Sequence, residues 1–492
     1  MSESQSSYRQ IMKATSLFGG VQVFNIIIQI IRSKFIAVIL GPAGMGIAGL
    51  LTSSIGLISA ITSFGLGTSA IKDIAAANAT GNEVRIATII GVFRKLVWFT
   101  GILGMILTLF LSPWLSQITF GNRNYTIAFV WISITLLFSQ LTTGRLVVLQ
   151  GMQKMQSLAK ANLTGSFLGL IIIIPIYYYL KLDGIVPGII IASIISLLMA
   201  WFFSKNIKIQ KVHISRVKTI AEGKNMLLLG FIISLSGLIT IGSSYLLRIF
   251  ISYKGGLSEV GLYNAGFALI NTYVGLVLSA MATDYFPRLS ANAGDNAFCT
   301  KTINEQAEIS ILLLTPLILS FIIFVKWVVI LLYSKKFIPI ENMIYWAAIG
   351  MLFRAVSWSV SFVFMAKGNA KLFFWNELFA SLYILLLNLL GYYLYGLTGI
   401  GLAFLIGYLL YSIQVIVINN TKYNFKFTNT FVKMFLIQTS LSIGCFVIIK
   451  ICPSPLNFIF GTLLLIFSII FSYIELNKRI GIASLIAKYR NK

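Results

Sequence analysis

Apolar stretches of about 20 residues recur along almost the whole chain, and they limit what it can fold into. A stretch of this length, coiled as a helix, crosses the hydrocarbon core of a bilayer. Helices suit that environment because they satisfy all their backbone hydrogen bonds internally. Of the 492 residues, 58% are hydrophobic and 10% are charged, whereas soluble proteins carry about a quarter charged residues. The chain is therefore predicted to be an all-α polytopic membrane protein with no soluble domain between its spans.

The apolar stretches, separated by glycine, proline and charged residues, predict about 14 transmembrane helices. The expected spans are 14–40, 47–71, 87–112, 125–149, 157–180, 185–204, 226–251, 259–286, 306–333, 340–366, 372–394, 399–419, 431–451 and 455–475.

Lysine and arginine are distributed unevenly between the two sets of loops that these spans define. The termini and every second loop, with the adjoining parts of the spans, hold 26 of the 38 basic residues, and the opposite loops, counted in the same way, hold seven. Because basic residues concentrate in cytoplasmic loops, both termini are predicted to be cytoplasmic, in a bacterial inner membrane. The same bias accounts for the net charge of +25 without any nucleic-acid partner.

No pattern in the chain predicts a cofactor, a metal or an enzyme active site. The three cysteines, Cys299, Cys445 and Cys452, form no CxxC pair. There is no Walker loop, no metal-ligand cluster and no base close to a candidate nucleophile. The polar stretch 1–16 leads into the first span without an A-x-A-like cleavage site, which predicts an uncleaved first helix.

Several unusual positions recur in the two halves of the chain at one shift in residue number, constant to within a single position. Arg32 aligns with Arg248, the segment GPAGMG (41–46) with the end of GGLSEVG (255–261), Trp131 with Trp346, and YYYLKLDGI (177–185) with YYLYGLTGI (392–400). Such repeats are common in transporters, and six intervening spans give both repeats the same orientation.

This repeat predicts two pseudo-symmetric six-helix bundles followed by two extra helices. We expect an N-terminal bundle over 1–204, a basic cytoplasmic linker over 205–225, a C-terminal bundle over 226–425, and two helices with a tail over 426–492. The linker's basic residues are explained by topology and by contact with anionic lipid.

Two stripes of polar residues, each ending in an arginine, follow the first and seventh predicted spans. Helical spacing places all members of each stripe on one face. The first stripe is Gln22, Asn25, Gln29 and Arg32, and the second is Ser236, Thr240, Ser244 and Arg248.

The two arginines are the main candidates for substrate binding. Arg32 precedes Gly41 by nine residues, which places it roughly 13 Å from the outer end of its helix. A charge at that depth costs at least about 2.5 kcal/mol, so it needs a partner, and an anionic ligand is a reasonable one. For the serine and threonine positions, contact with a neighbouring helix is the better explanation.

Other polar residues within the spans are weaker candidates for substrate or ion binding. Glu377 could bind a proton or a cation, whereas Asp284 could pair locally with Arg288. Asn264 and Asn271 could line a cavity or pair with another helix. Besides the two arginines, the candidates for substrate binding are Gln22, Asn25, Gln29, Arg354, Asn264 and Asn271, and those for ion coupling or gating are Asp284 and Glu377.

Three segments together resemble a known family. They are LGPAGMGIAGL (40–50), SFGLGTSAIKDIA (63–75) and LQGMQKMQSLAKANLTGSFLG (149–169). The pattern is similar to Wzx-type O-antigen translocases of the multidrug/oligosaccharidyl-lipid/polysaccharide (MOP) exporter superfamily.

This resemblance implies a MATE-like fold around a central cavity and a flippase that works by alternating access. The substrate that it implies is an undecaprenyl-diphosphate-linked oligosaccharide, such as an O-antigen unit, moved from the cytoplasmic to the periplasmic leaflet. In this sequence Arg32 and Arg248 match the cavity arginines that hold the diphosphate. Further partners to be tested are H⁺ or Na⁺, membrane lipids and polysaccharide polymerases.

Four alternatives remain open from the sequence. An ion-coupled multidrug antiporter would favour an acidic, aromatic cavity, and a lipid II flippase belongs to the same superfamily. A membrane glycosyltransferase, polymerase or ligase would be expected to have a large outer loop or exposed catalytic acids. A non-catalytic scaffold would leave the two midplane arginines unexplained.

Overall fold

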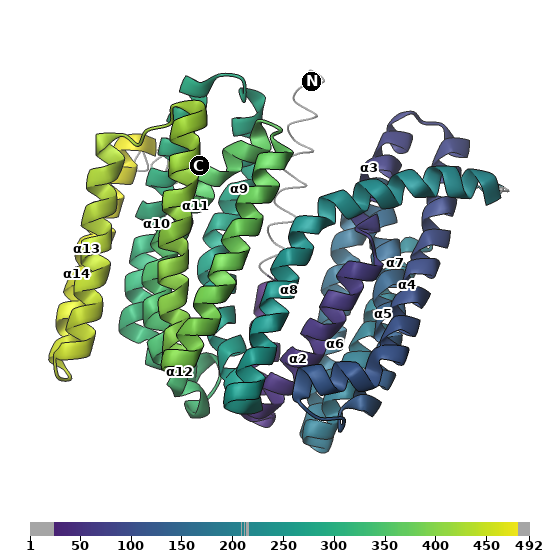
Figure 1. Cartoon of the computed structure of the whole chain (residues 1–492), viewed down its shortest axis with the longest axis horizontal. Helices are drawn as coiled ribbons and strands as arrows, with labels where there is room; N and C mark the ends of the chain where they lie inside the picture. The colour runs from purple at the N-terminus through teal and green to yellow at the C-terminus, as the bar shows by residue number, and fades with distance from the viewer. Residues whose placement is uncertain (1–23, 208, 211, 213–215, 481–492) are drawn as a thin grey trace, which may run out of the picture. The chain divides into compact units, whose positions relative to one another are not determined.

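The computed structural model describes residues 24–207, 209–210, 212 and 216–480, and the described part is helical apart from short connections (Figure 1). The chain divides into two compact units, Met1–Gly261 and Leu262–Lys492, each treated below by itself.

Unit 1 begins with a helix over residues 24–39, the described part of the first predicted span. Its other helices are α2 (Gly41–Thr62), α3 (Leu66–Ala79), α4 (Glu83–Phe120), α5 (Thr126–Gly151), α6 (Met155–Leu180), α7 (Ile185–Ser204) and α8 (Arg216–Ala268), which continues into unit 2.

Unit 2 contains the end of α8, a π-helical turn (Leu269–Val274) and six further helices. These are α9 (Gly275–Ala291), α10 (Asn296–Leu332), α11 (Glu341–Ala366), α12 (Ala370–Tyr423), α13 (Asn429–Ile451) and α14 (Leu456–Ile480). Figure 1 shows α13 and α14 side by side at the edge of this unit, where both contact α10.

Polar caps fix where several of these helices begin. The Asn82 side chain accepts a hydrogen bond from the Arg85 amide at 3.0 Å at the start of α4. Asp295 accepts from the Ala297 amide at 2.8 Å at the start of α10. These caps satisfy amide groups that the first turn of a helix cannot pair internally.

The outer surface of both units is apolar, as a lipid environment requires. Phe110 in unit 1 is 81% exposed, and Leu331 in unit 2 is 74% exposed. In water, so many exposed large apolar side chains would promote association. In a bilayer they contact acyl chains instead, which agrees with the predicted membrane protein.

Nine described helical segments are long and apolar enough to cross a membrane. Two of them, Met155–Ser204 and Ala370–Tyr423, each cover two predicted spans, and the backbone departs from helical geometry between those spans at Lys181 and at Gly396. The predicted spans 14–40, 226–251 and 259–286 also fall on helix over their described residues.

Two details of the predicted spans were wrong. The span 47–71 is interrupted by a turn at 63–65, where Phe64 and Gly65 have positive φ. An added Cβ on Gly65 would lie 2.1 Å from the Gly230 carbonyl oxygen, so α8 crosses closely at this break. The segment GPAGMG (41–46) is the first turn of α2 rather than a loop, because only Gly41 leaves helical geometry.

The predicted linker 205–225 is helical over its second half, because α8 begins at Arg216. From there α8 contacts α4 at two widely separated places. Arg85 of α4 pairs with Glu222 near the start of α8, and the Gln117 carbonyl accepts from the Tyr253 hydroxyl at 2.7 Å much further along both helices. These two contacts join α8 to both end regions of α4 within unit 1.

The backbone supports the internal repeat. Gly41 and Gly256, Gln153 and Gly368, and Lys181 and Gly396 all have positive φ, and the shift in residue number is identical for the three pairs. Since a positive φ is uncommon outside glycine, three pairs at one shift indicate that both repeats bend at equivalent places.

A reciprocal close contact in unit 1 follows the same shift. A Cβ added to Gly46 would lie 1.9 Å from the Leu257 carbonyl oxygen, and one added to Gly261 would lie 1.8 Å from the Pro42 carbonyl oxygen. Pro42 and Leu257 are themselves related by the repeat shift, as are Gly46 and Gly261. The start of α2 thus packs on the equivalent turn of α8 with no room for a side chain.

Candidate functional site

Arg32 lies half-buried on the helix 24–39, and it has a neutral polar partner. Its guanidinium interacts with the hydroxyl of Tyr177 on α6. Tyr177 is held in place because it is 1% exposed and packs against Gly188, where an added Cβ would lie 2.8 Å from the ring. Arg32 forms no ion pair with any described acidic residue, so it keeps its charge for another partner.

The rest of the first predicted stripe is placed only in part. Gln22 lies outside the described residues. Gln29 is exposed, whereas the side-chain oxygen of Asn25 is buried and finds no hydrogen-bond donor among the described residues. A buried amide oxygen without a hydrogen-bond donor is unfavourable in free energy, so this face of the helix can still accept a hydrogen bond.

Arg248 donates hydrogen bonds within its own helix. Its Nη1 donates to the Ser244 carbonyl oxygen at 2.9 Å and to the Ser244 hydroxyl. Thr240, the next stripe residue, is exposed, and the Ser236 side chain is not among those the structure describes. Ser244 is therefore a positioning residue for Arg248 rather than a contact to another helix.

Arg354 lies near the middle of α11 and is surrounded by neutral groups. It donates to the side-chain oxygen of Asn271, on the π-helical turn, and its guanidinium carbon lies 5.4 Å from the centre of the Tyr408 ring. The Met351 sulfur is 3.8 Å away. Of the two asparagine candidates, Asn271 thus pairs with another helix, and Asn264 lies half-buried on α8.

Glu377 belongs to a hydrogen-bonded cluster formed by the two halves of α12. It accepts hydrogen bonds from the Tyr411 hydroxyl and, at 3.3 Å, from the Asn376 side chain. Gln414 donates to the Asn376 side-chain oxygen at 2.8 Å, and the Tyr383 hydroxyl is buried without a described partner. No described basic residue pairs with Glu377.

Tyr411 could not be identified from sequence as a partner of Glu377, because the two residues lie on different halves of α12. Tyr408 lies 6.5 Å from Tyr411, ring centre to ring centre, so the Arg354 and Glu377 groups are connected through aromatic rings. The only signal of this cluster in the sequence was the unusual number of polar residues within the two apolar halves of α12.

Asp284 is in an exposed position that suits a structural ion pair. Its carboxylate lies 3.9 Å from Arg288, which confirms the predicted i,i+4 pair, and Arg288 lies 3.9 Å from Glu305 as well. With a side chain 84% exposed, Asp284 is not enclosed as an ion-coupling group would be.

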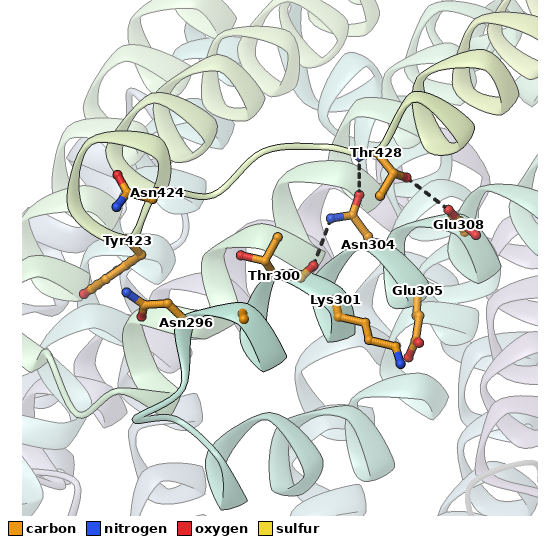
Figure 2. A pocket seen from close by; sticks show the side chains of 10 residues that line it. Asn296, Thr300, Lys301, Asn304, Glu305, Glu308, Tyr423, Asn424 and Thr428 are labelled. Atoms are coloured by element: carbon orange, nitrogen blue, oxygen red, sulfur yellow. Dashed lines mark hydrogen bonds between the residues drawn. The ribbon is translucent and has the colours of Figure 1, made fainter.

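A cavity of about 570 Å³ opens where α10 begins and α12 ends (Figure 2). Asn304 spans it, donating to the Thr300 carbonyl at 2.8 Å and accepting from the Thr428 amide at 2.8 Å. These bonds fasten the connection between α12 and α13 to α10. Because Lys301, Glu305 and Glu308 all line it, the cavity carries mixed charge and has no clear preference for an anion.

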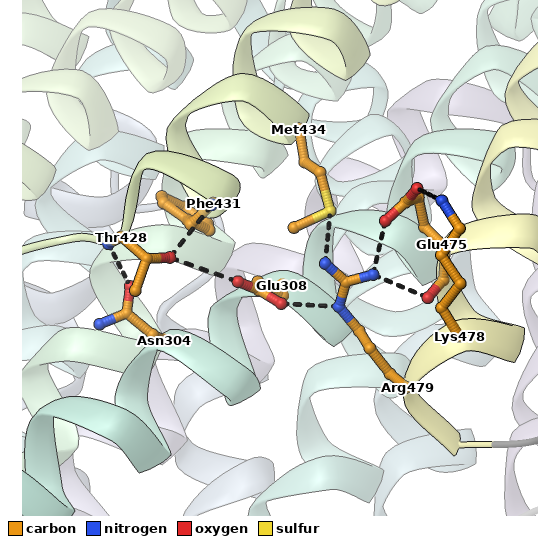
Figure 3. Close-up of polar contacts among 8 residues, drawn as sticks. All are labelled: Asn304, Glu308, Thr428, Phe431, Met434, Glu475, Lys478 and Arg479. Atoms are coloured by element: carbon orange, nitrogen blue, oxygen red, sulfur yellow. Dashed lines mark hydrogen bonds and ion pairs between the residues drawn. The ribbon is translucent and has the colours of Figure 1, made fainter.

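Beside this cavity, Arg479 of α14 joins three helices (Figure 3). Its Nε donates to Glu308 of α10 at 2.7 Å and its Nη1 to Glu475 at 2.6 Å, while Nη2 lies 3.3 Å from the sulfur of Met434 on α13. Sequence reasoning missed this network because Glu308 and Arg479 are 171 residues apart. Their opposite charges at the ends of two predicted spans were the available signal.

Comparisons with known proteins agree with this architecture. The family model described as "Polysaccharide biosynthesis protein" matches residues 11–293, more than half of the chain. A Shigella flexneri protein named "Putative O-antigen transporter" is 25% identical over 344 residues, which cover 69% of this chain and 80% of that protein.

Two solved structures share the fold. A structure titled "Lipid II flippase MurJ, inward closed conformation" has a TM-score of 0.71 at 15% identity, covering 95% of this chain and 99% of its own. An inward-facing multidrug resistance MATE family transporter of the MOP superfamily has a TM-score of 0.67 at 15% identity, covering 84% of this chain and 96% of its own. The predicted all-helical, MATE-like fold is confirmed.

Proposed function

Because the chain belongs to the polysaccharide biosynthesis protein family, we propose that it is a flippase for undecaprenyl-diphosphate-linked oligosaccharide. The cargo is an O-antigen or related surface polysaccharide unit, moved from the cytoplasmic to the periplasmic leaflet by alternating access. The family consists of transporters rather than enzymes, and the named O-antigen transporter supports this cargo.

The observation that carries the proposal is the neutral surroundings of two arginines within apolar helices. Arg32 interacts with Tyr177, and Arg354 with Asn271 and Tyr408. Neither forms an ion pair with a described acid. A charge held in a membrane span without a counter-charge is costly unless an anionic ligand compensates it.

The chemistry of the cargo fits such groups. Each unpaired hydroxyl buried in hydrocarbon costs on the order of 1–3 kcal/mol, so an oligosaccharide needs a hydrated, polar pathway. Arginine presents a planar fork of donors that matches phosphate oxygens, which makes it the appropriate residue for a diphosphate. Asn25 and Gln29, on the same helix as Arg32, would add neutral contacts to sugar hydroxyls.

The test is flipping of a diphosphate-linked oligosaccharide by purified protein in proteoliposomes. Arg32→Ala, Arg248→Ala and Arg354→Ala should each lower the rate by about tenfold or more, since each removes a charge-assisted phosphate contact. Arg123→Ala removes one charge from the exposed connection 121–125 and is the matched control. If all three test variants fold and transport like wild type, binding of the diphosphate does not depend on these residues.

The competing function is an ion-coupled multidrug antiporter, and the Glu377 cluster is the feature that favours it. A buried carboxylate beside tyrosines could bind a proton or an organic cation. Against this, Arg354 already occupies the neighbourhood of the Tyr408 ring. Glu377→Gln should abolish drug export driven by a pH gradient if the antiporter assignment is correct. It should leave lipid flipping intact if the cargo moves without proton coupling.

Lipid II is the nearest alternative cargo, because it also carries a diphosphate. The same proteoliposomes loaded with lipid II instead of the oligosaccharide donor distinguish the two. Faster flipping of lipid II would reassign the cargo while leaving the roles of the arginines unchanged.

A further inference from the structure

A second basic site lies on unit 1, away from the residues invoked for transport. It is a surface pocket of about 280 Å³ formed by α4, α5 and α7. Arg94, Trp98, Arg145 and Trp201 line it, together with leucine side chains.

Close helix packing forms the floor of this pocket. Gly144 of α5 allows the approach of α4, because an added Cβ would lie 2.9 Å from the Val97 side chain. The rim is open, since Trp98 is 51% and Trp201 is 48% exposed. The pocket therefore faces the surroundings of unit 1 and is not part of its packed core.

No described residue compensates the charge within the pocket. Arg94 and Arg145 are close enough to interact electrostatically with each other. Neither forms an ion pair or hydrogen bond with any described residue. Lys205 adds positive charge nearby, with its Nζ 5.6 Å from the centre of the Trp201 ring.

The depth of the pocket suits a lipid headgroup. Arg94 lies seven residues inside the predicted span 87–112, and Arg145 lies four residues before the end of the span 125–149. At 1.5 Å per residue both are about 6–10 Å from the end of the hydrocarbon core. Tryptophan favours this interfacial level, and arginine side chains reach from it towards the phosphates.

We propose that this pocket binds an anionic membrane phospholipid, with Arg94 and Arg145 as ligands of its phosphate and Trp98 and Trp201 packed against the glycerol and upper acyl chains. Two guanidinium groups can hold one phosphodiester through several charge-assisted hydrogen bonds. A lipid supplies both the anion and the apolar contacts that this lining requires. The site is separate from the proposed transport residues Arg32 and Arg248.

The test measures lipid binding to the purified full-length protein by native mass spectrometry. The probes are phosphatidylglycerol, phosphatidylcholine, undecaprenyl diphosphate and inorganic phosphate. The variant R94Q/R145Q removes both charges, and R94K/R145K keeps the charge without the donor fork. The control K154Q/K160Q removes two exposed charges near the start of α6, outside the pocket.

The proposal requires wild type and K154Q/K160Q to bind phosphatidylglycerol alike and in preference to phosphatidylcholine. R94Q/R145Q should bind it about tenfold more weakly, and R94K/R145K should lie between them. Melting temperatures close to that of wild type would show that the variants are folded.

Three results would overturn the proposal. The first is binding by R94Q/R145Q as strong as that of wild type, and the second is an equal loss in K154Q/K160Q, which would indicate general surface electrostatics. The third is selectivity for undecaprenyl diphosphate, or displacement of the lipid by an equal concentration of inorganic phosphate. Selectivity for undecaprenyl diphosphate would assign the pocket to the cargo, and displacement by inorganic phosphate would assign it to a simple anion.

Discussion

The two units share backbone features but treat their charged residues differently. Positive-φ residues recur at one shift in residue number, at Gln153 and Gly368 and again at Lys181 and Gly396. The pairing of arginines with acidic residues does not recur in this way. In unit 2 Arg479 lies between two glutamates and Arg288 between Asp284 and Glu305, whereas Arg354 has the neutral neighbours Asn271 and Tyr408.

In unit 1 three arginines at membrane depth have no acidic partner among the described residues. This holds for Arg32, Arg94 and Arg145, whereas Arg85, which pairs with Glu222, lies outside the predicted spans. The difference teaches that the bends define the fold common to both repeats. An arginine that pairs with an acidic residue has a structural role, whereas one without such a partner is available to a ligand. Variants that alter the bends should therefore affect folding, and variants that alter pairing should affect function or local stability.

The largest effect is expected at the reciprocal glycine contact. Gly46→Val should reduce the free energy of unfolding by about 3 kcal/mol or more, because its Cβ would lie 1.9 Å from the Leu257 carbonyl oxygen and backbone must move. Thermal unfolding followed by size-exclusion chromatography measures this. Gly56→Val on the same helix is the control, since no atom lies within 4 Å of its added Cβ.

A Gly46→Val protein as stable as Gly56→Val would show that this crossing tolerates side chains. The repeated glycines would then be incidental to the fold. Gly261→Val, at the equivalent position, should behave like Gly46→Val and provides an independent repetition.

The next largest effect is expected where Arg479 of unit 2 pairs with Glu308. Glu308→Gln should destabilise the attachment of α14 by about 1–3 kcal/mol, because Arg479 is only 22% exposed and loses a charged partner at 2.7 Å. Hydrogen exchange of α14 amides should increase while that of α5 does not change. Lys478→Gln is the control, since Lys478 is 64% exposed and its pair with Glu475 contributes little. Equal protection in Glu308→Gln and wild type would contradict a structural role for this network.

Much of the fold could be predicted from the sequence because it depends on local signals. Apolar stretches located most of the described helices, and paired glycines located the bends at Gly41 and Gly256. The break at Phe64 could not be predicted, since a phenylalanine with positive φ is unusual and the cause is the distant approach of Gly230. The helical start of α8 was hidden by its basic composition.

The candidate site was predictable in position but not in its contacts. The sequence predicted helices at Arg32 and Arg248, and both residues lie on helices in the structure. Their neighbours come from other helices or from tertiary packing, as Tyr177 does for Arg32. Periodicity gives the face on which a residue lies, but it does not say what packs against that face.

A smaller effect tests whether an arginine can bind the cargo because its neighbours are neutral. Asn271→Asp is nearly isosteric and gives Arg354 the acidic partner that Arg479 already has. If the cargo uses the Arg354 charge, flipping should fall by about tenfold, because the new carboxylate competes with the diphosphate. Proteoliposome flipping measures this, and Asn264→Asp, which changes the charge equally on α8, is the comparison. Unchanged flipping in Asn271→Asp would assign Arg354 to packing.

The smallest effect is expected at Asp284, where the charge pair is exposed. Asp284→Asn removes a contact of 3.9 Å from a side chain that is 84% exposed, and Arg288 keeps Glu305 at the same distance. Exposed pairs of this kind contribute about 0–1 kcal/mol, so stability should hardly change. Flipping should also be unaffected, with or without a pH gradient, because an ion-coupling carboxylate needs a more enclosed position. Loss of gradient-driven transport in Asp284→Asn alone would instead make this residue the coupling group. It would also show that a charge paired within the protein can take part in transport, and the contrast between paired charges and charges available to a ligand would then fail.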